Sequence, residues 1–183
     1  MLVYYGKQSK CRGVDTMLKE EIYNLDTREN SPVIVLPWFH NCRVLIDTGA
    51  TLPMWLKGVT PLKLKGAVKE NQSVNLNGVG GSSTGDLYRV NFEIGNIHFK
   101  NLPIVHKEIS VADAYMILPA TLFEGMIYEI DNISHRLKIK VDDKEYYRDF
   151  RIKDKSGIPY IYLANTYETK EDAEADYKYN EIL

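Results

Sequence analysis

A chain of 183 residues, 44% of them hydrophobic, is long enough for one domain with additional segments and a sizeable core. Its net charge of −2 gives no electrostatic reason to expect a nucleic-acid partner. No apolar run approaches the length of a membrane span, and no charged-then-apolar leader opens the sequence, so we expect neither a membrane anchor nor a secretory signal.

Cysteine and histidine usage also limits the possible chemistry. The two cysteines, Cys11 and Cys42, are too few for a disulfide framework, and Cys42 is expected as a small buried residue within a strand. Together with the absence of a leader, this favours a reducing, cytoplasmic location. The histidines lack paired ligand spacing, so we predict no metal site and no cofactor.

The first 31 residues are predicted to be an N-terminal arm. Leu2 to Tyr5 is compatible with a strand. Asp15 to Leu25 is ambiguous, because its apolar residues fit helical spacing only loosely while two neighbouring glutamates fit a solvent face. A polar break over residues 26–31 then separates the arm from a β-rich run that begins at Pro32.

After that β-rich run, Asn41 is suited to the positive φ of a hairpin turn. The aliphatic run Val44 to Ile46 predicts a short buried strand. This strand is followed by Asp47, Thr48, Gly49 and Ala50. An ionised carboxylate beside apolar surface is costly unless it is paired or hydrogen-bonded, so Asp47 is a candidate functional residue. A simple surface turn is the alternative, since Asp, Thr and Gly are all common in turns.

Further strands are predicted where apolar and polar residues alternate and where turn residues separate such runs. Apolar and polar residues alternate over Asp86 to Ile94, as they do in a half-buried strand. Ile97 to Val105 is predicted to pair with this strand across a Gly95-Asn96 turn. Met126 to Ile130 and Arg136 to Val141 predict a second hairpin. Short strands separated by closely spaced turns favour an all-β barrel or sandwich.

The C-terminal part differs in composition from the rest of the chain. Residues 142–165 are predicted to contain peripheral strands packed on the domain, with Tyr146 to Ile152 paired to Ile158 to Leu163 across Gly157. Residues 166–183 form an acidic tail, for which a surface helix and a disordered segment are both open.

These residues together resemble a known family. Asp47-Thr48-Gly49-Ala50, entered from a hydrophobic strand, resembles the active-site signature of aspartic proteases, and Ala50 makes it more similar to the retropepsin-like branch than to pepsin. Asn75 to Gly81 resembles the glycine-rich flap, and Met116 to Phe123 resembles the second hydrophobic loop with its short helix. The resemblance spans residues 32–141 and is strongest to bacterial single-domain members.

The resemblance implies an all-β, retropepsin-like acid-protease barrel of one lobe, with one short helix near residues 120–125 and peripheral terminal segments. It also implies that Asp47 is catalytic, with support from Thr48, Gly49 and Ala50. An aspartic protease needs two carboxylates that share one water. This chain has one Asp-Thr-Gly, and Asp131, which also follows an apolar strand, continues into a turn sequence. The resemblance therefore implies a homodimer that hydrolyses an extended peptide.

Two further segments receive roles from the resemblance. The flap residues are Gly78, Val79, Gly80 and Gly81, for which an ordinary flexible loop is the alternative. The second hydrophobic loop is formed by Ile117, Leu118 and Pro119, and here the chain departs from the family, which usually has Gly in place of Pro119. Proline suits a helix start, so we expect the short helix to begin there.

A second function stays open at this stage. Pro119, the long N-terminal arm and the acidic tail are compatible with a catalytically silent module that keeps the protease fold and binds peptides or dimerises. Neither function involves a membrane or a nucleic acid.

Overall fold

The structure is a computed structural model, and it describes residues 18–28, 31–36, 41–56, 67–78, 81–94, 97–111, 113–142 and 146–180. The predicted strand Leu2 to Tyr5, the residue Cys11 and the predicted turn Gly95-Asn96 lie outside the described residues. No helix in the described part of the chain has the length and apolar character needed to cross a membrane.

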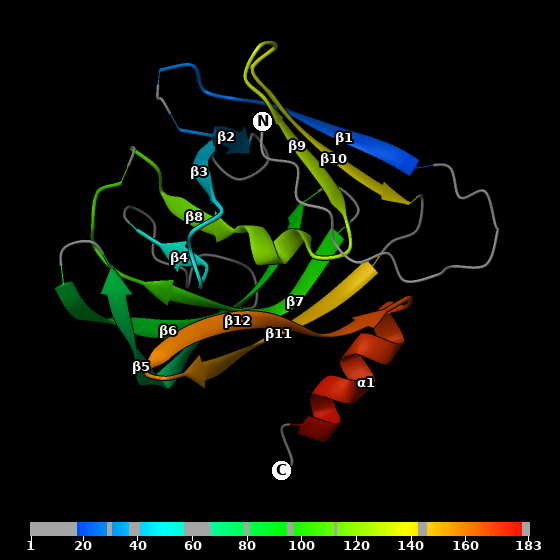
Figure 1. The fold of residues 1–183 in the computed structure, drawn as a ribbon. Helices are drawn as coiled ribbons and strands as arrows, with labels where there is room; N and C mark the ends of the chain where they lie inside the picture. Colours follow the sequence, from blue (N-terminus) through cyan, green and yellow to red (C-terminus); the bar gives the residue numbers. More distant parts are fainter. Residues whose placement is uncertain are drawn as a thin grey trace.

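The described chain consists mainly of β-strands (Figure 1). In order they are β1 (Leu18–Asn24), β2 (Val33–Leu36), β3 (Cys42–Asp47), β4 (Met54–Trp55), β5 (Val68–Gly78), β6 (Gly81–Ile94), β7 (Ile97–His106), β8 (Met116–Pro119), β9 (Ile127–Asp131), β10 (Arg136–Asp142), β11 (Tyr146–Lys155) and β12 (Ile158–Tyr167). The helices are the 3-10 helix η2 (Ala120–Phe123) and α1 (Lys170–Asn180). The predicted all-β class is confirmed, and a short helix lies at the predicted position near residue 120.

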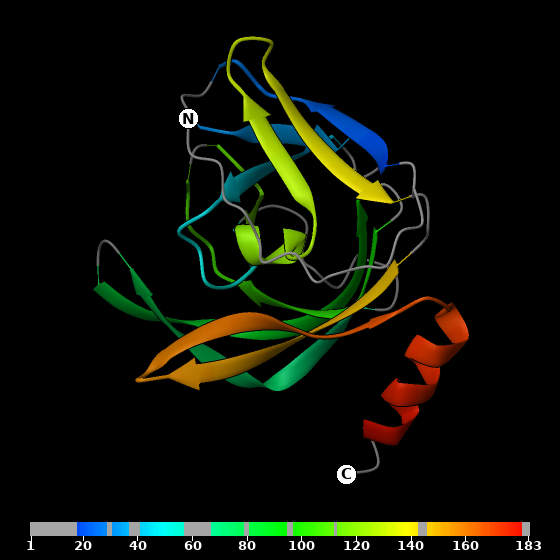
Figure 2. The ribbon, with the colours of Figure 1, turned by 45° about the vertical axis from the view of Figure 1, so that its right-hand side comes forward.

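The strands form two sheets. A 9-stranded sheet has the order β12-β11-β7-β4-β8-β3-β2, with β6 paired to β7 and β5 paired to β6. A 3-stranded sheet has the order β1-β10-β9. In Figures 1 and 2 the smaller sheet and the β11–β12 hairpin lie on opposite sides of β3 and η2. The end of β3 therefore lies between the 3-stranded sheet and the β11–β12 edge of the larger sheet.

The ambiguous segment Asp15 to Leu25 is a strand in its described part. β1 pairs antiparallel with β10, with Ile22 opposite Lys138 and Glu20 opposite Lys140. Leu25 continues toward the main sheet through a bridge to Ile34. Pairing with β10 decides the conformation here, because the helical pattern of the segment was weak and the edge of β10 offers backbone partners.

The region expected to be peripheral is part of the main sheet. β11 runs parallel to β7, and β12 pairs antiparallel with β11. Phe150 and Ile161 are 0% and 2% exposed and belong to the main core. The predicted turn at Gly157 is confirmed, since Ser156 and Gly157 both have positive φ, at 57° and 81°. These two strands therefore contribute to the core itself.

The acidic tail forms α1, so its helical alternative is confirmed for residues 170–180. Ala173 is 1% exposed, and Asp176 lies 3.5 Å from Arg151, which also pairs with Asp149 at 2.8 Å. The hydroxyl of Tyr167 donates to Asp176. Burial, followed by this hydrogen bond, raises the pKa of Tyr167 to about 12.

The strand that ends at Asp47 is buried on both faces. Val44 and Ile46 belong to the main core, whereas Leu45 packs in a second, smaller cluster with Ile117. A strand covered on both sides has a continuous aliphatic sequence, which accounts for the run over residues 44–46. Cys42 is 5% exposed as predicted, and its burial raises the pKa of the thiol to about 12.

One buried ion pair connects β3 to its surroundings. The Arg43 side chain is 8% exposed and pairs with the Asp26 carboxylate, which is 9% exposed. Arg43 Nε also donates to the carbonyl oxygen of Asp113 at 3.0 Å. Arg43 thus joins β3 to the segment before β2 and to the segment before β8.

We predict that Asp26→Ala lowers the free energy of unfolding by about 3 kcal/mol, because Arg43 loses its buried carboxylate and the exposed Asp113 carboxylate, 3.6 Å from Arg43 Nε, compensates less. Urea unfolding followed by tryptophan fluorescence measures the change. The double variant Asp26→Leu with Arg43→Met is the control, since replacing both charges by apolar groups is expected to restore most of the stability. An unfolding midpoint of Asp26→Ala equal to that of the wild type would contradict the role of this pair.

Candidate active site

Asp47 lies at the carboxyl end of β3, where the doubly covered strand reaches the surface. The Asp47 side chain is half-buried, and Thr48 and Gly49 are exposed. The backbone N–H of Gly49 donates to Asp47 Oδ1 at 2.8 Å, and the N–H of Ala50 donates to the Asp47 carbonyl oxygen at 3.3 Å. The turn thus holds one carboxylate oxygen in place at the end of a rigid strand.

The second hydrophobic loop lies directly beside this turn. β8 runs parallel to β3, with Ile117 beside Leu45 and Pro119 beside Asp47. Pro119 has φ −71° and ψ 151° and immediately precedes η2. The structure therefore brings Ile117, Leu118 and Pro119 next to the Asp47 turn, and the helix begins one residue after Pro119.

A shallow hollow of about 330 Å³ opens at Asp47. It is lined by Ser31, Pro32, Leu45, Ile46, Asp47, Thr48 and Ile130. The carbonyl oxygen of Pro32 accepts the N–H of Ile46 at 3.0 Å, which fixes one wall of the hollow. Ser31, Pro32 and Ile130 were not predicted at this site, because nothing in their local sequence shows that β9 and the segment before β2 lie beside Asp47.

The predicted flap lies on the longest hairpin of the described chain. β5 and β6 pair antiparallel up to Gly78 opposite Gly81, and Gly81 has φ +111°, a conformation that favours glycine. Val79 and Gly80 lie outside the described residues. Val74 and Leu76 of β5 pack against the main core, so one face of the hairpin is held by the body of the protein. Closure over a substrate stays a prediction.

Asp131, the other acid that follows an apolar strand, has a structural role in its own turn. Its Oδ1 accepts the backbone N–H groups of Ile133 and Ser134, both at 3.0 Å, and its Oδ2 accepts the Ser134 hydroxyl. These hydrogen bonds, led by the one from the Ser134 hydroxyl, lower the pKa of Asp131 to about 2.

No group of three His, Cys, Asp or Glu side chains among the described residues is arranged to hold a metal ion.

Comparisons with known proteins find similarity among solved structures. No protein-family model and no curated protein matches the chain. Among solved structures, the chain is similar to a retropepsin-like aspartic protease from Rickettsia conorii, with 18% sequence identity over 68% of this chain and 92% of that chain, and a TM-score of 0.41.

We predict that Pro119→Gly lowers the free energy of unfolding by about 1 kcal/mol, because φ at this position already suits proline and glycine adds freedom to the unfolded chain. Chemical denaturation of the two proteins measures the difference. Equal or higher stability of the glycine variant would show that the proline strains the second loop.

We predict that the contribution of Asp131 to stability depends on pH. Its pKa is lowered from 3.8 to about 2 in the folded protein, so its stabilising effect is complete above about pH 4 and is lost as the pH falls toward 2. Asp131→Ala should therefore melt at a lower temperature than the wild type at pH 6, and the two should converge near pH 2. A difference in melting temperature that is independent of pH would contradict this assignment.

Proposed function

We propose that the chain is an aspartic endopeptidase that acts as a homodimer, in which each copy supplies Asp47 as one of two catalytic carboxylates. One observation carries this proposal. A half-buried carboxylate lies at the end of a strand packed on both faces, and a backbone N–H from Gly49 holds one of its oxygens at 2.8 Å. A rigid strand that presents an acid to a surface hollow is suited to acid–base chemistry.

The surroundings of Asp47 support the need for a second copy. Thr48 and Gly49 are exposed, so the turn faces outward from this chain. A Cβ added at Gly49 would lie 3.4 Å from Asp47 Oδ1, at the limit of an ordinary contact, so the described part of this chain gives little steric reason for glycine. A second Asp47 turn brought close by a two-fold axis supplies such a reason, since a residue near that axis faces its own mate.

In the proposed reaction the two Asp47 carboxyl groups hold one water between them. The ionised carboxylate takes a proton from the water as the water attacks the scissile carbonyl carbon. The protonated carboxyl group gives its proton to the carbonyl oxygen. The carboxyl group that took the proton from water then gives it to the amide nitrogen as the C–N bond breaks. Two like charges a few Å apart repel, so a pair with one ionised and one protonated carboxyl group is matched to these opposite roles.

The proposed substrate is a peptide in an extended conformation that lies between the Asp47 turn and the β5–β6 hairpin. Such a peptide binds as an added strand, so its backbone provides affinity and alternate side chains provide selectivity. Leu45, Ile46 and Ile130 line the hollow at Asp47, which favours an apolar side chain next to the scissile bond.

One observation favours a second candidate function. Pro119 lies directly beside Asp47 in the parallel β3–β8 pairing and lacks the backbone N–H of the glycine usual there in the family. A catalytically silent module that binds peptides or dimerises is therefore the alternative. Cleavage of a peptide library that a statine-type inhibitor blocks would exclude it.

We predict that Asp47→Asn lowers the cleavage rate on the order of 10³-fold or more, while the circular-dichroism spectrum stays unchanged, because the amide cannot exchange protons with the water. Asp131→Asn is the matched control, since it changes the acid that follows another apolar strand and keeps a turn acceptor. Comparable peptidase activity in Asp47→Asn and the wild type would end the proposal.

A further inference from the structure

The segment that follows Asp47 is held by a strand distant in sequence. Thr51 comes directly after Ala50, and its carbonyl oxygen accepts the backbone N–H of Ile161 on β12 at 2.8 Å. Within the described residues, the Gly49 and Ala50 amides both donate to Asp47, and so to the turn itself. The bond from Ile161 therefore ties the Asp47 turn to a distant part of the fold.

β12 also contacts the other two segments of the candidate site. It touches η2, which continues the second hydrophobic loop, and it touches β5 of the predicted flap. The buried side chains of Ile161, Leu52 and Leu122 belong to the same core. In Figure 2 the β11–β12 hairpin (orange) crosses beneath the loop that follows β3 (cyan).

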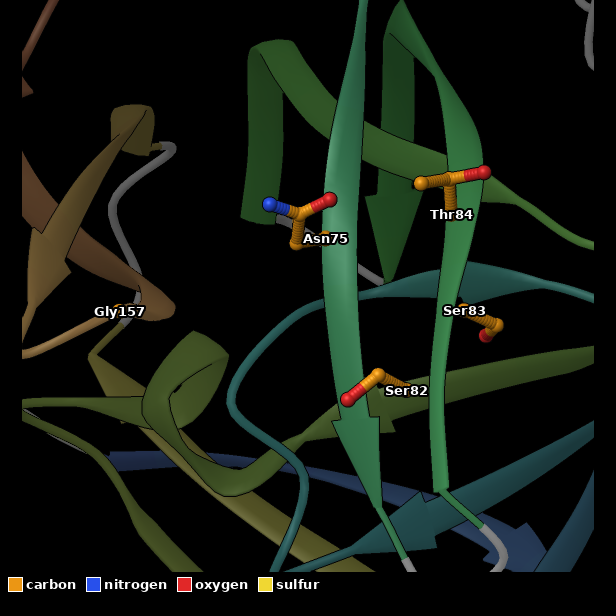
Figure 3. Close-up of a pocket in the computed structure, with 5 residues that line it drawn as sticks. All are labelled: Asn75, Ser82, Ser83, Thr84 and Gly157. Carbon is orange, nitrogen blue, oxygen red and sulfur yellow. The ribbon is translucent and has the colours of Figure 1, made fainter.

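The turn of the β11–β12 hairpin lies beside the predicted flap. A hollow of about 310 Å³ is lined by Asn75, Ser82, Ser83, Thr84 and Gly157. Figure 3 shows Asn75, Ser82 and Thr84 on neighbouring strands, with Gly157 on a separate hairpin. Asn75 pairs with Thr84, and both are exposed, whereas Val74 and Leu76 pack on the core. Since side chains alternate along a strand, Asn75 and Thr84 face away from Val74 and Leu76, and the β11–β12 turn lies beside this part of the flap hairpin.

The β11–β12 hairpin is itself well anchored. β11 is paired with β7, and Phe150 is 0% exposed. At the turn, the N–H of Gly157 donates to Asp154 Oδ1 at 2.8 Å. Because protein interiors are close-packed, a hairpin that is fixed in the core also fixes the segments that contact it.

From these contacts we infer that the β11–β12 hairpin positions the candidate active site, by holding the Asp47 turn relative to η2 and to the flap hairpin. Ile161 is the positioning residue, and it acts through its backbone N–H on Thr51. The effect on catalysis depends on the proposed function, whereas the effect on the Asp47 turn does not. A displacement of about 1 Å of a reacting group is enough to lower a rate on the order of 10²-fold.

Ile161→Pro tests the inference, because proline removes the N–H that reaches Thr51. That N–H points away from β11, so the substitution leaves the β11–β12 ladder intact, and proline is accepted at such strand positions. Ile161→Ala is the matched control, since it removes the buried side chain but keeps the N–H. Native-state hydrogen exchange measures the exchange rates of the Gly49 and Ala50 amide hydrogens in each protein.

We expect the Gly49 and Ala50 amides to exchange about tenfold faster in Ile161→Pro than in Ile161→Ala, compared at equal global stability by adjusting urea. If the endopeptidase proposal is correct, kcat also falls on the order of 10²-fold in Ile161→Pro, with a smaller change in KM. Equal exchange of the turn amides in the two variants would overturn the inference, whatever the activity. Faster exchange in a protein that cleaves nothing would keep the positioning role and reject the proposed function.

A measurement on the wild type keeps the test decisive if Ile161→Pro does not fold. The amides of Ile161, Gly49 and Ala50 are expected to exchange through one shared opening, with the same dependence on urea concentration. Strong protection of Ile161 together with unprotected Gly49 and Ala50 amides would show that the turn moves independently of β12, and the inference would fail.

Discussion

β3 is buried on both faces, and this burial fixes the position of Asp47 at its end. Leu45 faces one core and Ile46 faces the other, so the strand cannot shift in register without exposing aliphatic surface on one side and burying Asp47 on the other. A carboxylate at the end of such a strand has a well-defined position. The free-energy cost of placing this carboxylate beside apolar surface is limited. Asp47 lies where β3 leaves the core, and Gly49 donates a hydrogen bond to its side chain.

The acidic side chains of the fold differ in what they do. Asp26 neutralises a buried guanidinium, Asp149 pairs with Arg151, and Asp131 closes a turn through its own hydrogen bonds. Each of these groups is accounted for by packing or turn formation. Asp47 also accepts a hydrogen bond from its own turn, as Asp131 does, but its side chain lines a surface hollow. This difference makes Asp47 the best candidate for chemistry.

Local patterns were sufficient to predict much of the fold. The aliphatic run before Asp47, the alternation from Asp86 to Ile94 and the turn at Gly157 each specify their structure within a few residues. Long-range pairing was not predictable in this way. The strand β1 depends on the edge of β10, and the place of β11 in the main sheet depends on a parallel pairing with β7. For the same reason the sequence did not show that Ile130 borders Asp47 or that Ile161 holds Thr51.

The proposed homodimer requires Asp47 from two copies of the chain for each active site. Mixing wild-type chains with Asp47→Asn chains, after dissociation and reassociation, tests this requirement. If mixed dimers with one carboxylate are inactive, an equal mixture retains about a quarter of the activity of the same total amount of wild type, because pairing is random. An equal mixture that retains about half would mean that each chain works alone, and it would contradict the account.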